Sequence, residues 1–96
     1  MRNQDLCKEF VNQVSNIAYK EGSSMRVAWD GKRLFSYGTC IGECLSDGSF
    51  ILNATKYSTT TSKHQTYLKR SLVGHKVVVT TKWVPMGTTE LIRYAI

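Results

Sequence analysis

The sequence lacks the features that mark membrane, secreted or disordered proteins. None of its apolar runs approaches the ~18 residues of a membrane span, and its N-terminus leads into an amphipathic stretch rather than the apolar core of a signal peptide. Only one of the 96 residues is proline and 42% are apolar, which argues against a disordered or fibrous chain. The three cysteines are an odd number, as expected in a reducing cytoplasm. We therefore expect one cytoplasmic domain over residues 1–96.

Acidic residues are missing from a long part of the chain. The net charge is +6 at pH 7, from 13 Lys and Arg against 7 Asp and Glu. The two signs balance over residues 1–47, whereas residues 48–89 contain six Lys or Arg and no Asp or Glu. Surfaces that serve solubility alone usually intersperse both signs, and a one-signed stretch is typical of a polyanion-binding protein. The alternative is that these lysines only protect edge strands from aggregation.

The first half of the hydrophobic pattern predicts a helix followed by strands. Apolar residues recur at helical spacing over residues 4–21, and Gly22 is placed to end that helix. Over residues 25–54 the period becomes two. The dipeptides Asp30-Gly31 and Asp47-Gly48 predict two β-hairpins with type I′ turns.

The second half predicts another helix and another hairpin. Residues 62–73 form a helical pattern in which Leu68 and Leu72 share one side and basic residues the other. Residues 76–95 are predicted to form a C-terminal β-hairpin, with Trp83 on its apolar face. The predicted order is α-β-β-β-β-α-β-β, which is an α+β domain.

Residues suited to catalysis or metal binding are scattered. Cys40 and Cys44 would point to one face of a strand, and with His64 and His75 they leave a Cys2His2 zinc site as a minor alternative to core packing. The carboxylates form no pair that suggests acid/base or two-metal work, and no glycine-rich nucleotide motif occurs. We expect no enzyme activity, no metal and no cofactor.

A hydroxyl-rich segment precedes the second predicted helix. The predicted strand around residues 48–56 leads into Ser58-Thr59-Thr60-Thr61-Ser62. A helix N-terminus presents unpaired N–H groups and a partial positive charge, which suit a phosphate. In the alternative interpretation the hydroxyls only cap the helix and Lys56 is only a loop charge.

This segment carries a resemblance to a known family. Gly48-Ser49-Phe50-Ile51-Leu52-Asn53-Ala54-Thr55-Lys56, followed by Tyr67-Leu68-Lys69-Arg70, resembles the KilA-N domain of phage and large DNA virus proteins, which is similar to the fungal APSES DNA-binding domain. The resemblance covers about residues 34–73. Over the whole chain, the sequence is also similar to small uncharacterised phage proteins.

The resemblance implies a viral nucleic-acid-binding module that acts in the host cytoplasm, with duplex DNA as the favoured ligand. The second helix and its N-terminus would contact phosphates, and lysines of the last hairpin would follow the backbone like a wing. Asn53 could either contact DNA or fix a turn, and His64 would be a partly buried spacer. The candidate nucleic-acid-binding residues are Lys56, Thr60, Ser62, Lys63, Thr66, Tyr67, Lys69, Arg70, Lys76 and Lys82.

A second hypothesis comes from a different class. A small basic phage protein without catalytic residues could be an anti-defence, anti-CRISPR-like inhibitor that binds a host protein or nucleoprotein complex. Its candidate anchors are the aromatic residues Tyr57, Tyr67, Trp83 and Tyr94.

Overall fold

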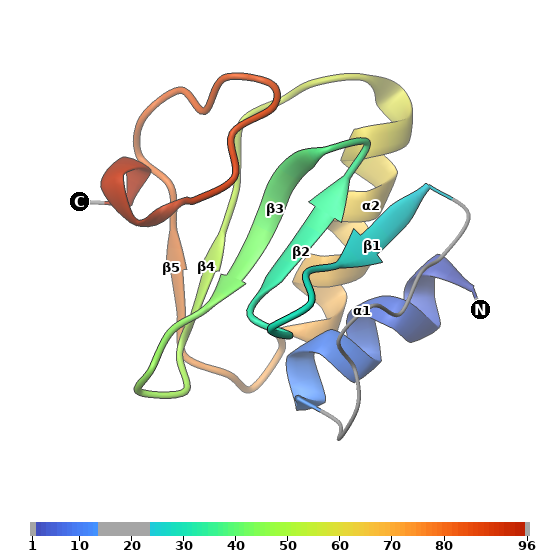
Figure 1. The fold of residues 1–96 in the computed structure, drawn as a ribbon, viewed down its shortest axis with the longest axis vertical. Helices are drawn as coiled ribbons and strands as arrows, with labels where there is room; N and C mark the ends of the chain where they lie inside the picture. Colours follow the sequence, from blue (N-terminus) through green and yellow to red (C-terminus); the bar gives the residue numbers. More distant parts are fainter. Residues whose placement is uncertain (1, 14–23, 96) are drawn as a thin grey trace.

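The structure, a computed structural model, describes residues 2–13 and 24–95 (Figure 1). In chain order the elements are α1 (Asn3–Asn12), β1 (Met25–Val27), β2 (Arg33–Ser36), β3 (Thr39–Cys44), β4 (Phe50–Leu52), α2 (Thr59–Ser71), β5 (Val77–Val79) and the 3-10 helix η1 (Ile92–Tyr94). The strands form one sheet in the order β1-β2-β3-β4-β5. The first four strands are antiparallel neighbours, and β5 runs parallel to β4 after the crossover through α2. The predicted α+β class is confirmed.

Both helices cover the same face of the sheet. Leu6 and Phe10 of α1 and Leu68 of α2 are buried in one core cluster with apolar residues of β1 to β4. Figure 1 shows α1 and α2 side by side, with α2 behind the sheet in this view. At Gly42 a Cβ would lie only 2.6 Å from Leu68 Cδ2, so the missing side chain lets α2 approach β3 closely.

The opposite face of the sheet is covered by the C-terminal segment, residues 80–95. Val84 and Leu91 are buried there against Phe35, Cys40 and Ile51. The predicted C-terminal hairpin over residues 76–95 is therefore wrong: within the described residues this region contains one strand, β5, and the rest is irregular apart from η1. The period-two pattern identified the strand but could not specify that it pairs in parallel with β4.

The first helix is shorter than predicted. It ends at Asn12, because the next residue, Gln13, takes a left-handed conformation (φ 49°). The backbone N–H of Gln13 caps the helix. The helical pattern over residues 4–21 continued past this point, but residues 14–21 and Gly22 lie outside the described residues. At the other end, Arg2 is the N-cap residue and makes no side-chain capping bond.

Both predicted hairpins within residues 25–54 are confirmed, but their turns differ from the prediction. Among the described non-glycine residues only Gln13 and Tyr37 have positive φ, so neither Asp30-Gly31 nor Asp47-Gly48 forms a type I′ turn. Instead Tyr37 (φ 50°) and Gly38 (φ 87°) provide the two positive φ angles, in the tight connection between β2 and β3. The aspartates act through their side chains, and Asp47 Oδ1 accepts from Ser49 N at 2.9 Å.

A bulge in β3 separates two cysteines that the spacing placed together. The register between β2 and β3 shifts between the pairs Leu34↔Gly42 and Phe35↔Cys40. An extra residue reverses the alternation of side chains. Cys40 therefore packs under the C-terminal segment, whereas Cys44 packs on the helix face, so the expectation of a shared face was wrong.

Candidate nucleic-acid interface

The second helix begins three residues earlier than predicted and turns its basic side outward. Ser58 is its N-cap, and its hydroxyl accepts from Thr61 N at 3.2 Å. Leu68 and Leu72 are buried, as the pattern predicted. Of the predicted site residues on α2, five are exposed and two half-buried: Thr60, Lys63, Thr66, Lys69 and Arg70 are exposed, and Ser62 and Tyr67 are half-buried. This set, together with the exposed Lys56, is called the α2 surface below.

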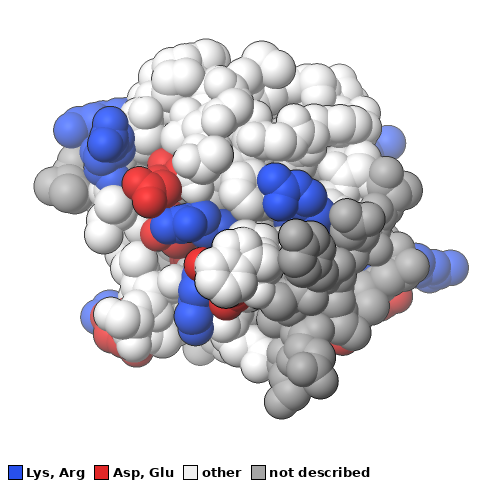
Figure 2. All heavy atoms as spheres, viewed as in Figure 1, with Lys and Arg blue, Asp and Glu red and all other residues white. Residues whose placement is uncertain are grey.

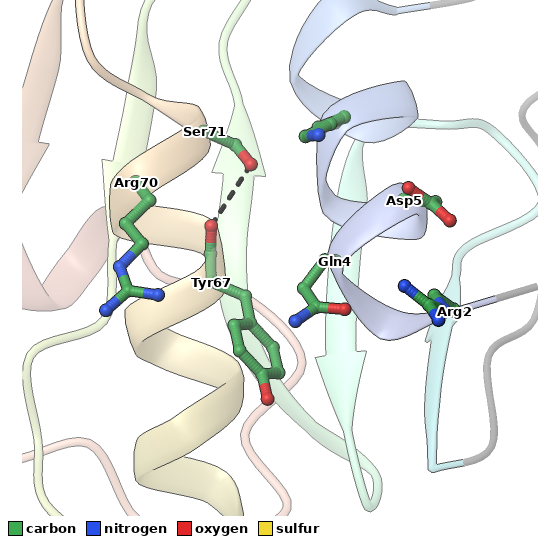
Figure 3. A pocket seen from close by; sticks show the side chains of 7 residues that line it. Arg2, Gln4, Asp5, Tyr67, Arg70 and Ser71 are labelled. Carbon is green, nitrogen blue, oxygen red and sulfur yellow. Dashed lines mark hydrogen bonds between the residues drawn. The ribbon is translucent and has the colours of Figure 1, made fainter.

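A groove of about 330 Å³ separates the α2 surface from α1. Figure 3 shows Tyr67 and Ser71 of α2 and Gln4 of α1 between the two helices, with Arg70 on the α2 side and Asp5 on the α1 side. The groove is lined by Arg2, Gln4, Asp5, Lys8, Tyr67, Arg70 and Ser71. Sequence reasoning missed Arg2 and Lys8, because only the packing of the two helices brings them beside α2.

A second groove, of about 300 Å³, lies on the other side of α2, against β4 and β5. Its floor includes Leu52, Ala54 and Val79, and Lys56 and Lys69 line it. Ser62 and Thr66 also line it and contribute hydroxyl groups. The structure thus brings seven of the ten predicted site residues onto α2, between two grooves, and Lys56 into the second of them.

The cations of the α2 surface have no carboxylate partners within residues 2–13 and 24–95. The ion pair recorded there joins Arg33 Nη2 to Glu90 Oε1 at 3.2 Å and lies on the opposite face of the sheet. The acidic residue that shares a groove with Arg70 is Asp5. Because four cations gather on this surface and none forms an ion pair within the described residues, we expect it to carry a positive potential toward solvent.

Lys76 and Lys82 do not form the predicted wing. Both side chains are exposed, but Lys76 precedes β5 and Lys82 follows it, in the irregular C-terminal segment. Trp83 was expected on the apolar face of a hairpin and is 67% exposed instead, because Val84 takes the buried position. Tyr94 is half-buried and packs on the core of the opposite face.

Within the Asn53-Ala54-Thr55-Lys56 segment, Asn53 and Thr55 are buried and hold neighbouring segments together, whereas Lys56 is exposed and belongs to the α2 surface. Asn53 is fully buried, and its amide donates to Cys40 O at 2.9 Å while its Oδ1 accepts from Thr55 N at 2.9 Å. Thr55 Oγ1 accepts from Val84 N at 2.9 Å. Gln65 of α2 donates to the carbonyls of Asn53 and Thr55, both at 2.8 Å. Of the two roles considered for Asn53, the turn-fixing one is confirmed.

His64 forms a second buried network. The side chain is 2% exposed; Nδ1 lies 2.6 Å from Ser36 Oγ, and Nε2 lies 3.2 Å from Ser24 Oγ. Burial lowers the pKa of His64 below its usual 6.5, so the ring is held neutral. Ser36 and His64 have the spacing of a nucleophile and its base, but both are buried away from any substrate.

The cysteines share this buried character. Burial raises the pKa of the Cys7 and Cys40 thiols to about 12 each, and it also raises the pKa of Cys44. All three are free, buried thiols in the two core clusters. The described part of the chain holds no group of three or more His, Cys, Asp or Glu side chains that could bind a metal.

Within the same residues, no helix is long and apolar enough to cross a membrane.

Comparison with known proteins assigns the chain to a family without assigning it an activity. The chain matches no curated protein and no solved structure. A family model described as a family of unknown function (DUF8033) matches residues 5–83, which include α1 from Asp5 onward, α2, the whole sheet and the α2 surface. The chain therefore belongs to the DUF8033 family.

Proposed function

We propose that this protein is a non-catalytic nucleic-acid-binding module that contacts the phosphates of duplex DNA through the α2 surface. The observation that carries the proposal is the group of exposed cations on one helix face, without ion pairs among the described residues. Phosphate neutralisation by Lys and Arg supplies most of the affinity of such modules.

The dimensions of α2 suit this role. Its 13 residues span about 20 Å, and the major groove of B-DNA is about 12 Å wide, enough to admit a helix. Exposed hydroxyls of Thr60 and Thr66 add hydrogen-bond donors beside the cations. The groove toward α1 adds Arg2 and Lys8, which increases the number of phosphates that one face could contact.

The resemblance to the KilA-N domain supports the same proposal, together with a viral or phage origin and action in the host cytoplasm. The Asn-Ala-Thr-Lys segment then has a mainly indirect role. Its buried residues orient α2 through Gln65 and do not contact DNA, whereas the exposed Lys56 contributes to the α2 surface.

The test is a fluorescence anisotropy titration with random-sequence duplex DNA at two salt concentrations. With about five phosphates neutralised, we expect a log–log salt slope of about −4 to −5. Lys63→Glu/Arg70→Glu should reduce the affinity by about 100-fold, because two attractive contacts become repulsive.

The matched control is Arg26→Glu/Arg93→Glu, which changes the net charge equally on the opposite face of the sheet. It should bind DNA within about threefold of the wild type, the range left to long-range charge alone. Equal loss of affinity in the two variants would mean that binding follows net charge and not the α2 surface. The competing inhibitor hypothesis predicts a stoichiometric host protein that stays bound after nuclease treatment of a lysate.

A further inference from the structure

Two segments far apart in sequence each carry a lysine followed by an aromatic residue, Lys56-Tyr57 and Lys82-Trp83. The fold brings the two rings together, with centroids 6.2 Å apart and planes at 54°. Trp83 is 67% exposed, and both lysines are exposed. Large aromatic side chains left in solvent beside polar groups are typical of binding surfaces.

The positions of both rings are fixed by buried neighbours. The Tyr57 hydroxyl donates to the Val84 carbonyl and accepts from Asn53 Nδ2 at 3.1 Å. Val84, the residue after Trp83, is buried, and its N–H donates to Thr55. The backbone beside each ring is thus anchored before any ligand arrives, which lowers the entropy cost of binding.

The charge around the rings selects the kind of partner. Both lysine–aromatic pairs lie in residues 48–89, which contain no Asp or Glu. Cations next in sequence to an exposed indole suit a ligand that combines flat rings with negative charge. A nucleic acid strand does so, because its bases stack on aromatic side chains while its phosphates meet the lysines.

The rings also adjoin the surface already described. Tyr57 directly precedes Ser58, the N-cap of α2. In Figure 1 the segment that enters α2 and the segment that follows β5 both pass above the upper end of the sheet. A strand that leaves a duplex held by α2 could therefore continue over the two rings.

We propose that Tyr57 and Trp83 form a stacking platform for an unpaired base, so that the preferred ligand is a duplex with a single-stranded extension. This inference rests on the proposed function, because α2 holds the duplex part. Bases inside an intact duplex are stacked on one another and cannot use the platform.

The experiment compares a blunt duplex with the same duplex carrying a thymidine overhang of about four nucleotides, within the site size of such surfaces. We expect the overhang to raise the affinity of the wild type by about tenfold, the typical effect of one stacked base. Trp83→Ala should abolish this gain and leave blunt-duplex binding unchanged, whereas Trp83→Tyr should keep most of it.

The chain offers a matched control. Trp29 is 73% exposed but lies beside Asp30, and Trp29→Ala should keep the full gain from the overhang. In a Trp29→Phe protein the remaining indole is Trp83, and its emission should be quenched by the overhang probe and not by the blunt one. This readout needs no change at the platform itself.

The outcomes separate the two proposals. If the wild type binds neither probe, both the DNA-binding function and the platform are wrong. If it binds both probes equally, or if Trp83→Ala keeps the gain, the platform alone is overturned. In that case the exposed indole serves another partner, such as a protein.

Discussion

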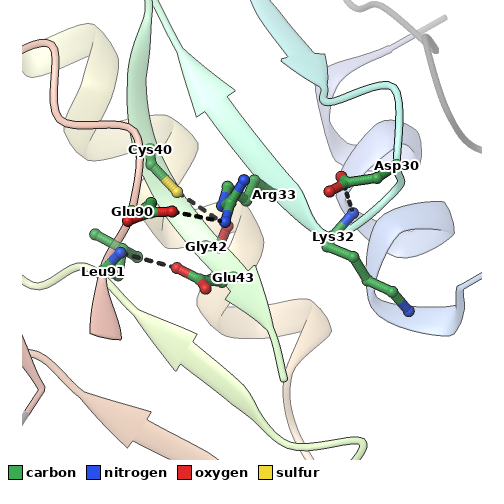
Figure 4. Close-up of polar contacts among 8 residues, drawn as sticks. All are labelled: Asp30, Lys32, Arg33, Cys40, Gly42, Glu43, Glu90 and Leu91. Atoms are coloured by element: carbon green, nitrogen blue, oxygen red, sulfur yellow. Dashed lines mark hydrogen bonds and ion pairs between the residues drawn. The ribbon is translucent and has the colours of Figure 1, made fainter. Parts of the chain in front are cut away.

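The two faces of the sheet are covered by different elements, and the charged side chains on the two faces differ in whether they have partners. On one face α1 and α2 pack over the larger core cluster, and the cations of α2 point away from it into solvent. On the other face an irregular segment covers the smaller cluster, and two of the cations there have partners. Arg33 forms an ion pair with Glu90 (Figure 4). The guanidinium of Arg26 lies 4.4 Å from the centre of the Phe35 ring.

Figure 2 shows the surface on the side away from α2, where blue and red side chains lie next to one another. The buried carboxylate of Glu43 accepts a hydrogen bond from Leu91 N at 2.8 Å and so holds the C-terminal segment on β3 (Figure 4). These charged side chains therefore stabilise the fold. The cations of the α2 surface form no ion pair within the described residues, which is why we propose DNA binding for that side.

The strongest test of this comparison is Asn53→Ala, at the point where the two faces are joined. The side chain is fully buried and makes three hydrogen bonds, to Cys40, Thr55 and Tyr57. Removing it leaves buried polar groups without partners, and we expect a loss of about 3 kcal/mol in the free energy of unfolding, measured in urea.

The folded Asn53→Ala variant should keep DNA affinity within about threefold of the wild type, because Asn53 cannot reach a ligand. Ser46→Ala, at an exposed position in the turn between β3 and β4, is the control and should leave stability unchanged. A large loss of affinity with normal stability would instead make Asn53 a DNA contact.

Gly42→Ala tests how α2 is seated on the helix face. The new Cβ would lie 2.6 Å from Leu68 Cδ2 and 3.4 Å from Phe10 Cε2, inside a packed core. We expect a loss of about 2 kcal/mol in the free energy of unfolding, from overpacking. The double variant Gly42→Ala/Leu68→Ala should show strong coupling in a double-mutant cycle, and additive effects would rule out this contact as the cause.

These residues also show where sequence reasoning stops. Local periodicity predicted both helices and the first four strands, because the apolar residues that each element buries recur at the spacing of that element. The glycines that interrupt the strand pattern, Gly38 and Gly42, indicated a possible bend or bulge. Periodicity could not place the bulge in β3 or show that Gly42 lets α2 approach the sheet, since both depend on a neighbouring element. Helical spacing likewise carried the first helix past Gln13, where the described helix ends.

The candidate site divides in the same way. The outward set Lys63, Thr66 and Arg70 followed from the helical pattern of one segment alone. Arg2 and Lys8 did not, because their place beside α2 is set by packing between helices. The Asn-Ala-Thr-Lys segment looked like a contact motif, yet its side chains bond segments up to 29 residues away, which no local pattern reveals.

The pH dependence of stability tests the buried network around His64. Its recorded partners Ser24, Ser36 and Asn3 are uncharged, and burial lowers the pKa of His64 below 6.5. The unfolded chain then binds the proton first, so the free energy of unfolding should fall as pH drops below about 6.5 and level off below the folded-state pKa.

His64→Gln should remove this decline in urea titrations between about pH 7.5 and 5, and His75→Gln, at an exposed ring, should keep it. Asp47 does not interfere. Hydrogen bonds from the Ser49 hydroxyl and N–H lower the pKa of Asp47 below 3.8, so its contribution is lost only as pH falls through that more acidic range. A decline that persists in His64→Gln would assign it to another group.

The smallest effect is expected for the ion pair on the opposite face. Arg33 and Glu90 keep 29% and 56% of their side chains exposed, so their double-mutant coupling energy should be about 0.5 kcal/mol and should vanish in high salt. The same salt increase should weaken DNA binding by orders of magnitude. If salt changed stability strongly and DNA affinity only slightly, the charged side chains on both faces would stabilise the fold. The proposal that the α2 surface binds DNA would then be wrong.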